Sequence, residues 1–187
     1  MARREVAAHP PARRRTGFTL LELAVVLAIT IVLGAVAVPS FSGLVARQRL
    51  KSVAHSLQAD IGLARQEAGR RGMAVHLMFH PGPQWCYGLS AGFGVDCRQA
   101  QTAPGNGVIK VVRGADHAGT TLLEASAMAI DPRNGSSLLA EGHARFGSSQ
   151  AGQQLQVQLG RLGRASVCAP AAPVPNTPAC PSTAPPS

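Results

Sequence analysis

The longest apolar run in the chain lies near its N-terminus, between residues 18 and 38. Its 21 residues, FTLLELAVVLAITIVLGAVAV, contain a single charged side chain, Glu22. As a helix rising about 1.5 Å per residue, the run would span roughly 31 Å, close to the thickness of the hydrocarbon core of a bilayer. The pattern therefore predicts one membrane crossing.

A basic segment, residues 1–17, precedes this run and carries five arginines against one acidic residue, Glu5. Because positively charged flanks stay on the cytoplasmic side, we expect residues 39–187 on the other side of the membrane. A secretory signal peptide cleaved near Ala37 is the alternative. The position of Glu22 tells against it, because a carboxylate four residues into an apolar span is costly without a cationic partner.

A second helical pattern follows Pro39, at which we expect a kink. Apolar residues recur there at spacings of three and four, while charged residues, Asp60 among them, fall mostly elsewhere. The segment ends at Gly72, a residue typical of helix C-termini. The spacing predicts an amphipathic helix over 39–72 whose apolar stripe is buried against a sheet. The stripe comprises Leu50, Val53, Leu57, Ile61, Ala64 and Ala68.

Residues 73–168 change to a period of two, which is typical of strands. Proline and glycine clusters at 81–83 and 104–107 indicate turns. The pattern predicts an α+β domain, with the long helix packed on one antiparallel sheet of about four to seven strands. The strand candidates are 75–79, 108–112, 122–130, 144–146 and 155–159.

The last segment, residues 169–187, contains seven prolines and no charged side chain. This composition predicts an extended or disordered tail.

Four cysteines are present, and they allow three disulfide pairings. Pairing of neighbours, Cys86–Cys97 and Cys168–Cys180, is the simplest, and each bridge would add about 3 kcal/mol if unstrained. A zinc site would need closely spaced ligand pairs, and neither C-x-x-C nor a suitable histidine pair occurs. We expect no metal and no cofactor.

The six histidines are scattered, and no nucleophile elbow, zinc-protease or phosphate-loop motif accompanies them. We therefore expect no enzymatic activity.

An arginine-containing turn follows the alternating strand candidate LQVQL. It consists of Gly160, Arg161, Leu162, Gly163 and Arg164. Glycines let a backbone turn tightly and approach a ligand, and two adjacent guanidinium groups suit phosphate oxygens. The turn predicts contact with a nucleic-acid backbone, and a purely structural turn is the alternative.

The N-terminal residues GFTLLE, followed by the apolar helix and Pro39, resemble the class III leader of type IV pilins and type II secretion pseudopilins. The resemblance implies that a prepilin peptidase cuts between Gly17 and Phe18 and methylates the new Phe18 amine. It also implies that the apolar helix is retained, and that the subunit has a pilin-like fold, a long helix packed on an antiparallel head.

In a filament of parallel helices, Glu22 would pair with the Phe18 amine of a neighbouring subunit. The attraction would offset a desolvation penalty of several kcal/mol per ion. Assembly would then depend on cleavage, which creates that amine. The alternative is that the Glu22 side chain extends to the membrane surface without a partner.

The sequence GRLGRASVC resembles the end of the head in the FimT/GspH branch of minor pilins and pseudopilins, although it has additional residues between the arginines and before Cys168. Trp85 and Gly88 match a W-x-x-G element of the same branch. FimT-like members are implicated in capturing DNA for natural transformation, so the resemblance implies non-specific binding of double-stranded DNA by the turn.

Three functions are open at this point: a FimT-like minor pilin that binds DNA, a GspH-like pseudopilin of a type II secretion system, and a pilin that only primes assembly. Each implies partner pilins or pseudopilins. Each also implies a single-pass subunit of the bacterial inner membrane with its head in the periplasm, later joining a pilus or pseudopilus. Without residues 1–17 the chain retains 13 basic and eight acidic side chains, a modest surplus for an anionic partner.

Overall fold

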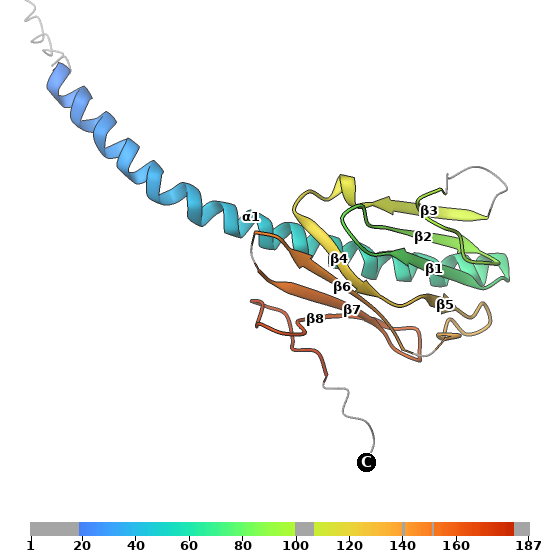
Figure 1. The fold of residues 1–187 in the computed structure, drawn as a ribbon. Coiled ribbons are helices and arrows are strands. Elements are labelled where there is room, and N and C mark those ends of the chain that lie inside the picture. Colours follow the sequence, from blue (N-terminus) through green and yellow to red (C-terminus); the bar gives the residue numbers. More distant parts are fainter. Residues whose placement is uncertain (1–18, 100–106, 140, 151, 182–187) are drawn as a thin grey trace, which may run out of the picture. The chain divides into compact units, whose positions relative to one another are not determined.

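The computed structural model describes residues 19–99, 107–139, 141–150 and 152–181, apart from the side chains of residues 36–40. The chain forms two compact units, Met1–Ser40 and Phe41–Ser187. The second unit is called the head below. The predicted α+β class is confirmed, because one long helix is followed by antiparallel strands (Figure 1).

A single helix, α1 (Leu20–Arg71), runs through Pro39, the residue at which the sequence predicted a kink. Its N-terminus is capped by Thr19, whose Oγ1 accepts a hydrogen bond from the Glu22 N–H at 3.2 Å. Its C-terminus is closed by Gly72, which has a φ of +67° and donates its N–H to Ala68 O at 2.9 Å. Among the residues described, no helix is both long and apolar enough to cross a membrane.

The head contains two antiparallel four-stranded sheets, and this corrects the prediction of one sheet. The first has the order β3-β2-β1-β5 and the second β4-β6-β7-β8. The first sheet consists of β1 (Val75–His80), β2 (Cys86–Ala91), β3 (Val108–Arg113) and β5 (Met128–Ile130). The second consists of β4 (Thr120–Ala125), β6 (Gly142–Ser148), β7 (Gln154–Leu159) and β8 (Ala165–Cys168). A short 3-10 helix, η1 (Gly114–Asp116), precedes β4.

The segment predicted as one strand, 122–130, is where the chain passes from one sheet to the other. β4 ends at Ala125, and β5 begins at Met128 in the first sheet. Leu122 and Met128 are both buried in the same core. Because both sheets face that core, the apolar pattern continues across the junction and conceals it.

The apolar stripe of α1 is buried, as predicted, with every member at most 1% exposed. It forms one core cluster with residues of both sheets, including Leu77 of β1 and Phe146 of β6. Figure 1 shows this part of α1 running along the strands. The helix therefore supplies the common surface on which both sheets pack.

Asp60 is buried beside the stripe, although the sequence pattern placed it among the charged residues off the stripe. Its side chain is only 4% exposed and accepts hydrogen bonds from the Tyr87 hydroxyl at 2.8 Å and from Lys110 Nζ at 2.6 Å. Burial, and then the negative charge of Asp60, raises the pKa of Tyr87 well above its usual range. Asp60 thus connects α1 to β2 and β3 through charge-assisted hydrogen bonds.

Trp85 connects the two sheets. Its Nε1–H donates to Thr120 O of β4 at 2.8 Å, and its ring contacts Phe146 of β6 edge-on at a centroid distance of 5.5 Å. The same ring stacks on Tyr87 and His117. A buried indole with its one donor satisfied contributes both apolar contact area and a fixed orientation.

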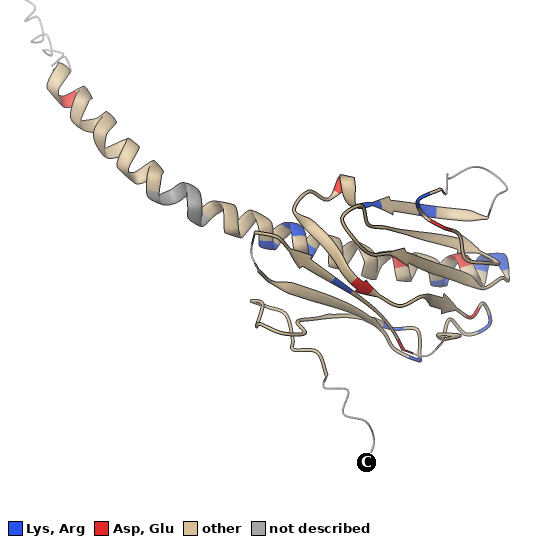
Figure 2. Cartoon of the chain, in the orientation of Figure 1, with Lys and Arg blue, Asp and Glu red and all other residues tan. Residues whose placement is uncertain are grey.

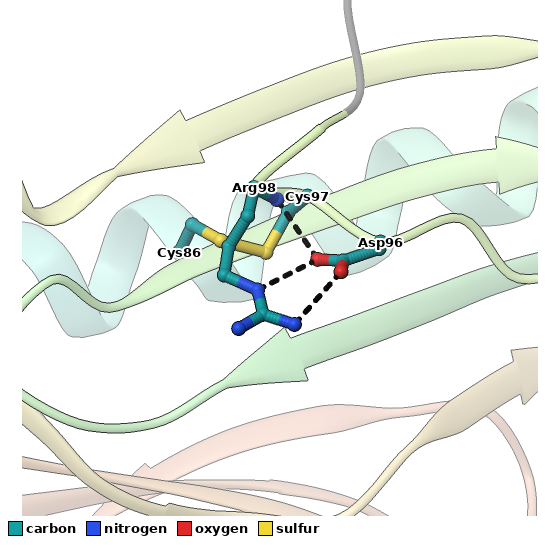
Figure 3. The surroundings of a disulfide bond; sticks show 4 residues. All are labelled: Cys86, Asp96, Cys97 and Arg98. Carbon is teal, nitrogen blue, oxygen red and sulfur yellow. Dashed lines mark hydrogen bonds and ion pairs between the residues drawn. A yellow bond between two sulfur atoms is a disulfide. The ribbon is translucent and has the colours of Figure 1, made fainter.

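Two disulfides join neighbouring cysteines, Cys86–Cys97 and Cys168–Cys180, as the sequence analysis expected. Figure 3 shows the first, which ties β2 to the segment that carries the ion pair of Asp96 with Arg98.

The described part of the C-terminal segment, residues 169–181, is folded against the head, and this corrects the prediction of an extended or disordered tail. Val174 is 3% exposed and belongs to the core cluster. Lys51 Nζ of α1 donates to Pro175 O at 2.6 Å. Prolines lack an N–H, but the Cys168–Cys180 disulfide and two backbone hydrogen bonds between Ala169 and the 178–180 segment order the chain.

Candidate functional site

The predicted arginine turn connects β7 to β8, the two strands at one edge of the second sheet. Gly160 donates its N–H to Arg164 O at 3.0 Å, and Gly163 donates its N–H to Gly160 O at 2.8 Å. These bonds close a compact hairpin loop. Arg161, Leu162 and Arg164 are exposed on it, and Leu162 has 78% of its surface accessible.

Gly163 has a structural reason to be glycine. Its φ is +73°, and a β-carbon there would collide with the carbonyl oxygen of Gly135. The close approach is made by a loop of the same chain, which corrects the expectation that the glycine makes room for a ligand. Ser137 of that loop also donates its N–H to Arg161 O at 3.0 Å. The turn is therefore held in place by its neighbour.

The two arginine side chains remain exposed despite this packing. Neither Arg161 nor Arg164 makes an ion pair or a side-chain hydrogen bond with any residue in the described part of the chain. Exposed guanidinium groups with unused N–H donors can donate bidentate hydrogen bonds to phosphate or carboxylate oxygens. The turn thus has the chemistry of an anion-binding loop.

Arg164 also lines a groove of about 570 Å³ on the outer face of the second sheet. The other lining residues are Glu124, Glu141, Gly142, His143, Arg145, Gln156, Gln158, Leu159, Gly160, Ser166 and Pro181. Glu124 lies 3.3 Å from His143 Nε2 and 3.3 Å from Arg145 Nη1. The groove is therefore polar and of mixed charge, and its cations are partly neutralised.

The sequence analysis singled out Gly160 and Arg164 of this groove, but not His143 or Arg145. The available signal was the period of two: His143 and Arg145 alternate with the buried Ala144 and Phe146, so they share the outward face of β6.

The N-terminal residues singled out by sequence lie only partly within the structure. Gly17 and Phe18 are outside the described residues. Glu22 is exposed in the first turn of α1, and its carboxylate has no partner among the residues described. A negative charge at this position is also stabilised by the positive end of the helix dipole.

No group of three or more potential metal ligands occurs among the residues that the structure describes. The cysteines are all in disulfides.

Comparison with known families gives two matches. A model described as prokaryotic N-terminal methylation motif matches residues 12–38. A model described as type II transport protein GspH matches residues 53–163, which is more than half of the chain. The chain belongs to the GspH family. With the methylation motif, membership identifies it as a minor type IV pilin or pseudopilin, a structural subunit that is membrane-anchored and then assembles with other pilins.

Two crystal structures of the type IV minor pilin FimU from Pseudomonas aeruginosa strain PAO1 are similar to this GspH-family chain. One has 22% sequence identity and a TM-score of 0.47 and covers 70% of this chain and 96% of its own. The other has 21% identity and a TM-score of 0.44 and covers 68% and 98%. No curated protein matches the chain.

The packing of the turn predicts different effects for its two glycines. Gly163→Ala should lower the free energy of unfolding by about 2 kcal/mol or more, because alanine disfavours positive φ and its β-carbon meets Gly135. Gly160→Ala is the matched control, since its β-carbon has only an ordinary contact, 3.8 Å from Arg164 O. Chemical unfolding followed by circular dichroism measures both. Equal effects would contradict the assigned packing.

Proposed function

We propose that this GspH-family protein is a minor type IV pilin whose head binds double-stranded DNA non-specifically through the turn that carries Arg161 and Arg164. The observation that carries the proposal is the pair of exposed guanidinium groups without partners in the described chain, on a turn whose backbone is fixed by Gly163. A fixed turn lowers the entropic cost of ordering a binding loop.

Phosphate contact explains why two arginines suffice for weak binding without sequence preference. Arginines that reach only the DNA backbone position a protein but carry no sequence information. They also release counterions, so affinity falls steeply with salt. DNA capture for natural transformation is the role that such binding would serve.

The route to the filament is part of the same proposal. A prepilin peptidase cleaves between Gly17 and Phe18 and methylates the Phe18 amine, and the subunit stays in the bacterial inner membrane through 18–38 with its head in the periplasm. Glu22 then pairs with the Phe18 amine of a neighbouring subunit in the filament. The methylation motif over residues 12–38 and the unpartnered Glu22 carboxylate support this step.

A second candidate function is a pseudopilin of a type II secretion system, and the description of the matching family model, type II transport protein GspH, favours it. A third is a pilin that primes assembly without binding DNA, and the packing of Gly163 against Gly135 favours it, because it gives the turn a structural role. The arginine side chains distinguish the first function from these two, since neither alternative requires them to bind DNA.

Replacing both turn arginines should remove most of the DNA binding. We expect the full-length mature chain in detergent to retard duplex DNA at low salt, and Arg161→Gln/Arg164→Gln to reduce the slope of log affinity against log salt by about 2. Arg47→Gln is the matched control, because Arg47 is an exposed arginine on α1. Unchanged retardation by the double variant would exclude the turn as the binding site.

Maturation gives an independent test of the N-terminal assignment. In a host with a prepilin peptidase, Gly17→Val should leave the precursor uncleaved, because the leader that the sequence resembles has glycine directly before the cut and valine places a branched side chain there. Mass spectrometry of the purified protein measures the N-terminus and the methyl group. Ala8→Val, a leader substitution away from the cut, should be processed normally. Normal processing of the Gly17 variant would refute the assignment.

A further inference from the structure

The loop that packs on the arginine turn carries a third exposed arginine. This loop, residues 131–137, follows β5 and is internally ordered: Gly135 donates its N–H to Asp131 O at 2.9 Å, and Asp131 donates its N–H to Ser136 O at 2.8 Å. The Asp131 carboxylate accepts the backbone N–H of Arg133 at 2.7 Å. The Arg133 side chain is exposed and has no partner among the described residues.

A fourth arginine reaches the same loop from α1. A β-carbon at Gly135 would lie 3.1 Å from Nε and 3.3 Å from Nη2 of Arg65, so the Arg65 guanidinium lies against this glycine. Gly135 in turn touches Gly163, between the two turn arginines. Arg65 is exposed and unpaired within the described chain.

The acidic side chains near these arginines are largely engaged elsewhere. Glu67, the next acidic residue after Arg65 on α1, is bound by Arg70 at 2.8 Å and by Arg71 at 2.6 Å. Hydrogen bonds from these two arginines hold the pKa of Glu67 at about 2. Asp131 caps its own loop. Glu141 is exposed and lines the same groove as Arg164.

Figure 2 shows basic residues toward the end of α1, in the loop after β5 and in the turn between β7 and β8, all at the same end of the head. The contacts of Gly135 with Arg65 and with Gly163 join these three segments directly. The sequence places them about 70 and 30 residues apart, so only the fold brings them together.

We propose that Arg65 and Arg133 complete a single phosphate-binding surface with Arg161 and Arg164, formed by α1, the 131–137 loop and the β7–β8 turn. The inference rests on the proposed DNA binding and extends it from one turn to three segments. Phosphates are regularly spaced along a duplex, so cations on separate, rigidly joined segments contact several of them at once. Each additional contact increases the salt dependence of binding.

The test measures the affinity of the full mature chain in detergent for duplex DNA at a series of salt concentrations. Arg65→Gln and Arg133→Gln should each reduce the slope of log affinity against log salt by about 0.9, and the two together by about 1.8. Arg65→Lys should keep the wild-type slope, because a lysine retains the charge. Arg47→Gln, on the same helix but 18 residues before Arg65, should leave the slope unchanged.

Thermal unfolding of each variant checks that the head is intact. One outcome separates the two proposals. If Arg65→Gln and Arg133→Gln keep the salt slope of the Arg47→Gln control, while the Arg161→Gln/Arg164→Gln variant has a smaller salt slope, then the extended surface is wrong and the proposed function stands. If the wild-type chain does not bind duplex DNA, both fail. A loss of slope in Arg65→Lys equal to that in Arg65→Gln would also overturn the inference, because the effect would then not follow charge.

Discussion

Burial of one face of α1 is the constraint on which the head depends. The stripe from Leu50 to Ala68 is covered by both sheets, so neither sheet could bury its apolar face without the helix. Two polar residues of α1, Asp60 and Gln58, fix the position of the helix within this core. Asp60 binds Tyr87 and Lys110 of the first sheet, and Gln58 Nε2 donates to Ala165 O of β8 at 3.0 Å. A buried carboxylate without its two donors would cost several kcal/mol, so the network specifies one register of helix against sheet.

The same packing positions the arginine surface. Gln58 holds the start of β8 beside α1, and the turn directly precedes β8. The turn then rests on the 131–137 loop through Gly163, and that loop lies against Arg65 of the helix. Thus the helix that buries the core also carries one of the four arginines. The surface is a consequence of the tertiary structure and needs no local strain beyond the positive φ of Gly135 and Gly163, which glycine accepts at little cost.

Much of the fold could be predicted from local sequence patterns. The α1 stripe, the Gly72 terminus and the pairing of neighbouring cysteines depend on short-range spacing, and the sequence displays them directly. What could not be predicted depends on contacts between distant residues. The alternation of apolar and polar residues does not show which sheet a strand joins. The sequence therefore did not reveal that the chain passes from the second sheet to the first between β4 and β5. Composition could not show that a proline-rich segment folds back, because a disulfide and Val174 order it. Arg65 and Arg133 resemble any solvated arginines until the contacts of Gly135 are known.

In the proposed complex, duplex DNA contacts the guanidinium groups of the β7–β8 turn. The most direct measurement follows the side-chain Nε–H NMR signals of the arginines in the full mature chain in detergent while duplex DNA is added. We expect the signals of Arg161 and Arg164 to shift or broaden at low salt and to recover at high salt, while that of Arg47 stays in place. Unchanged signals from both turn arginines, with DNA bound to the protein, would contradict the proposed contact.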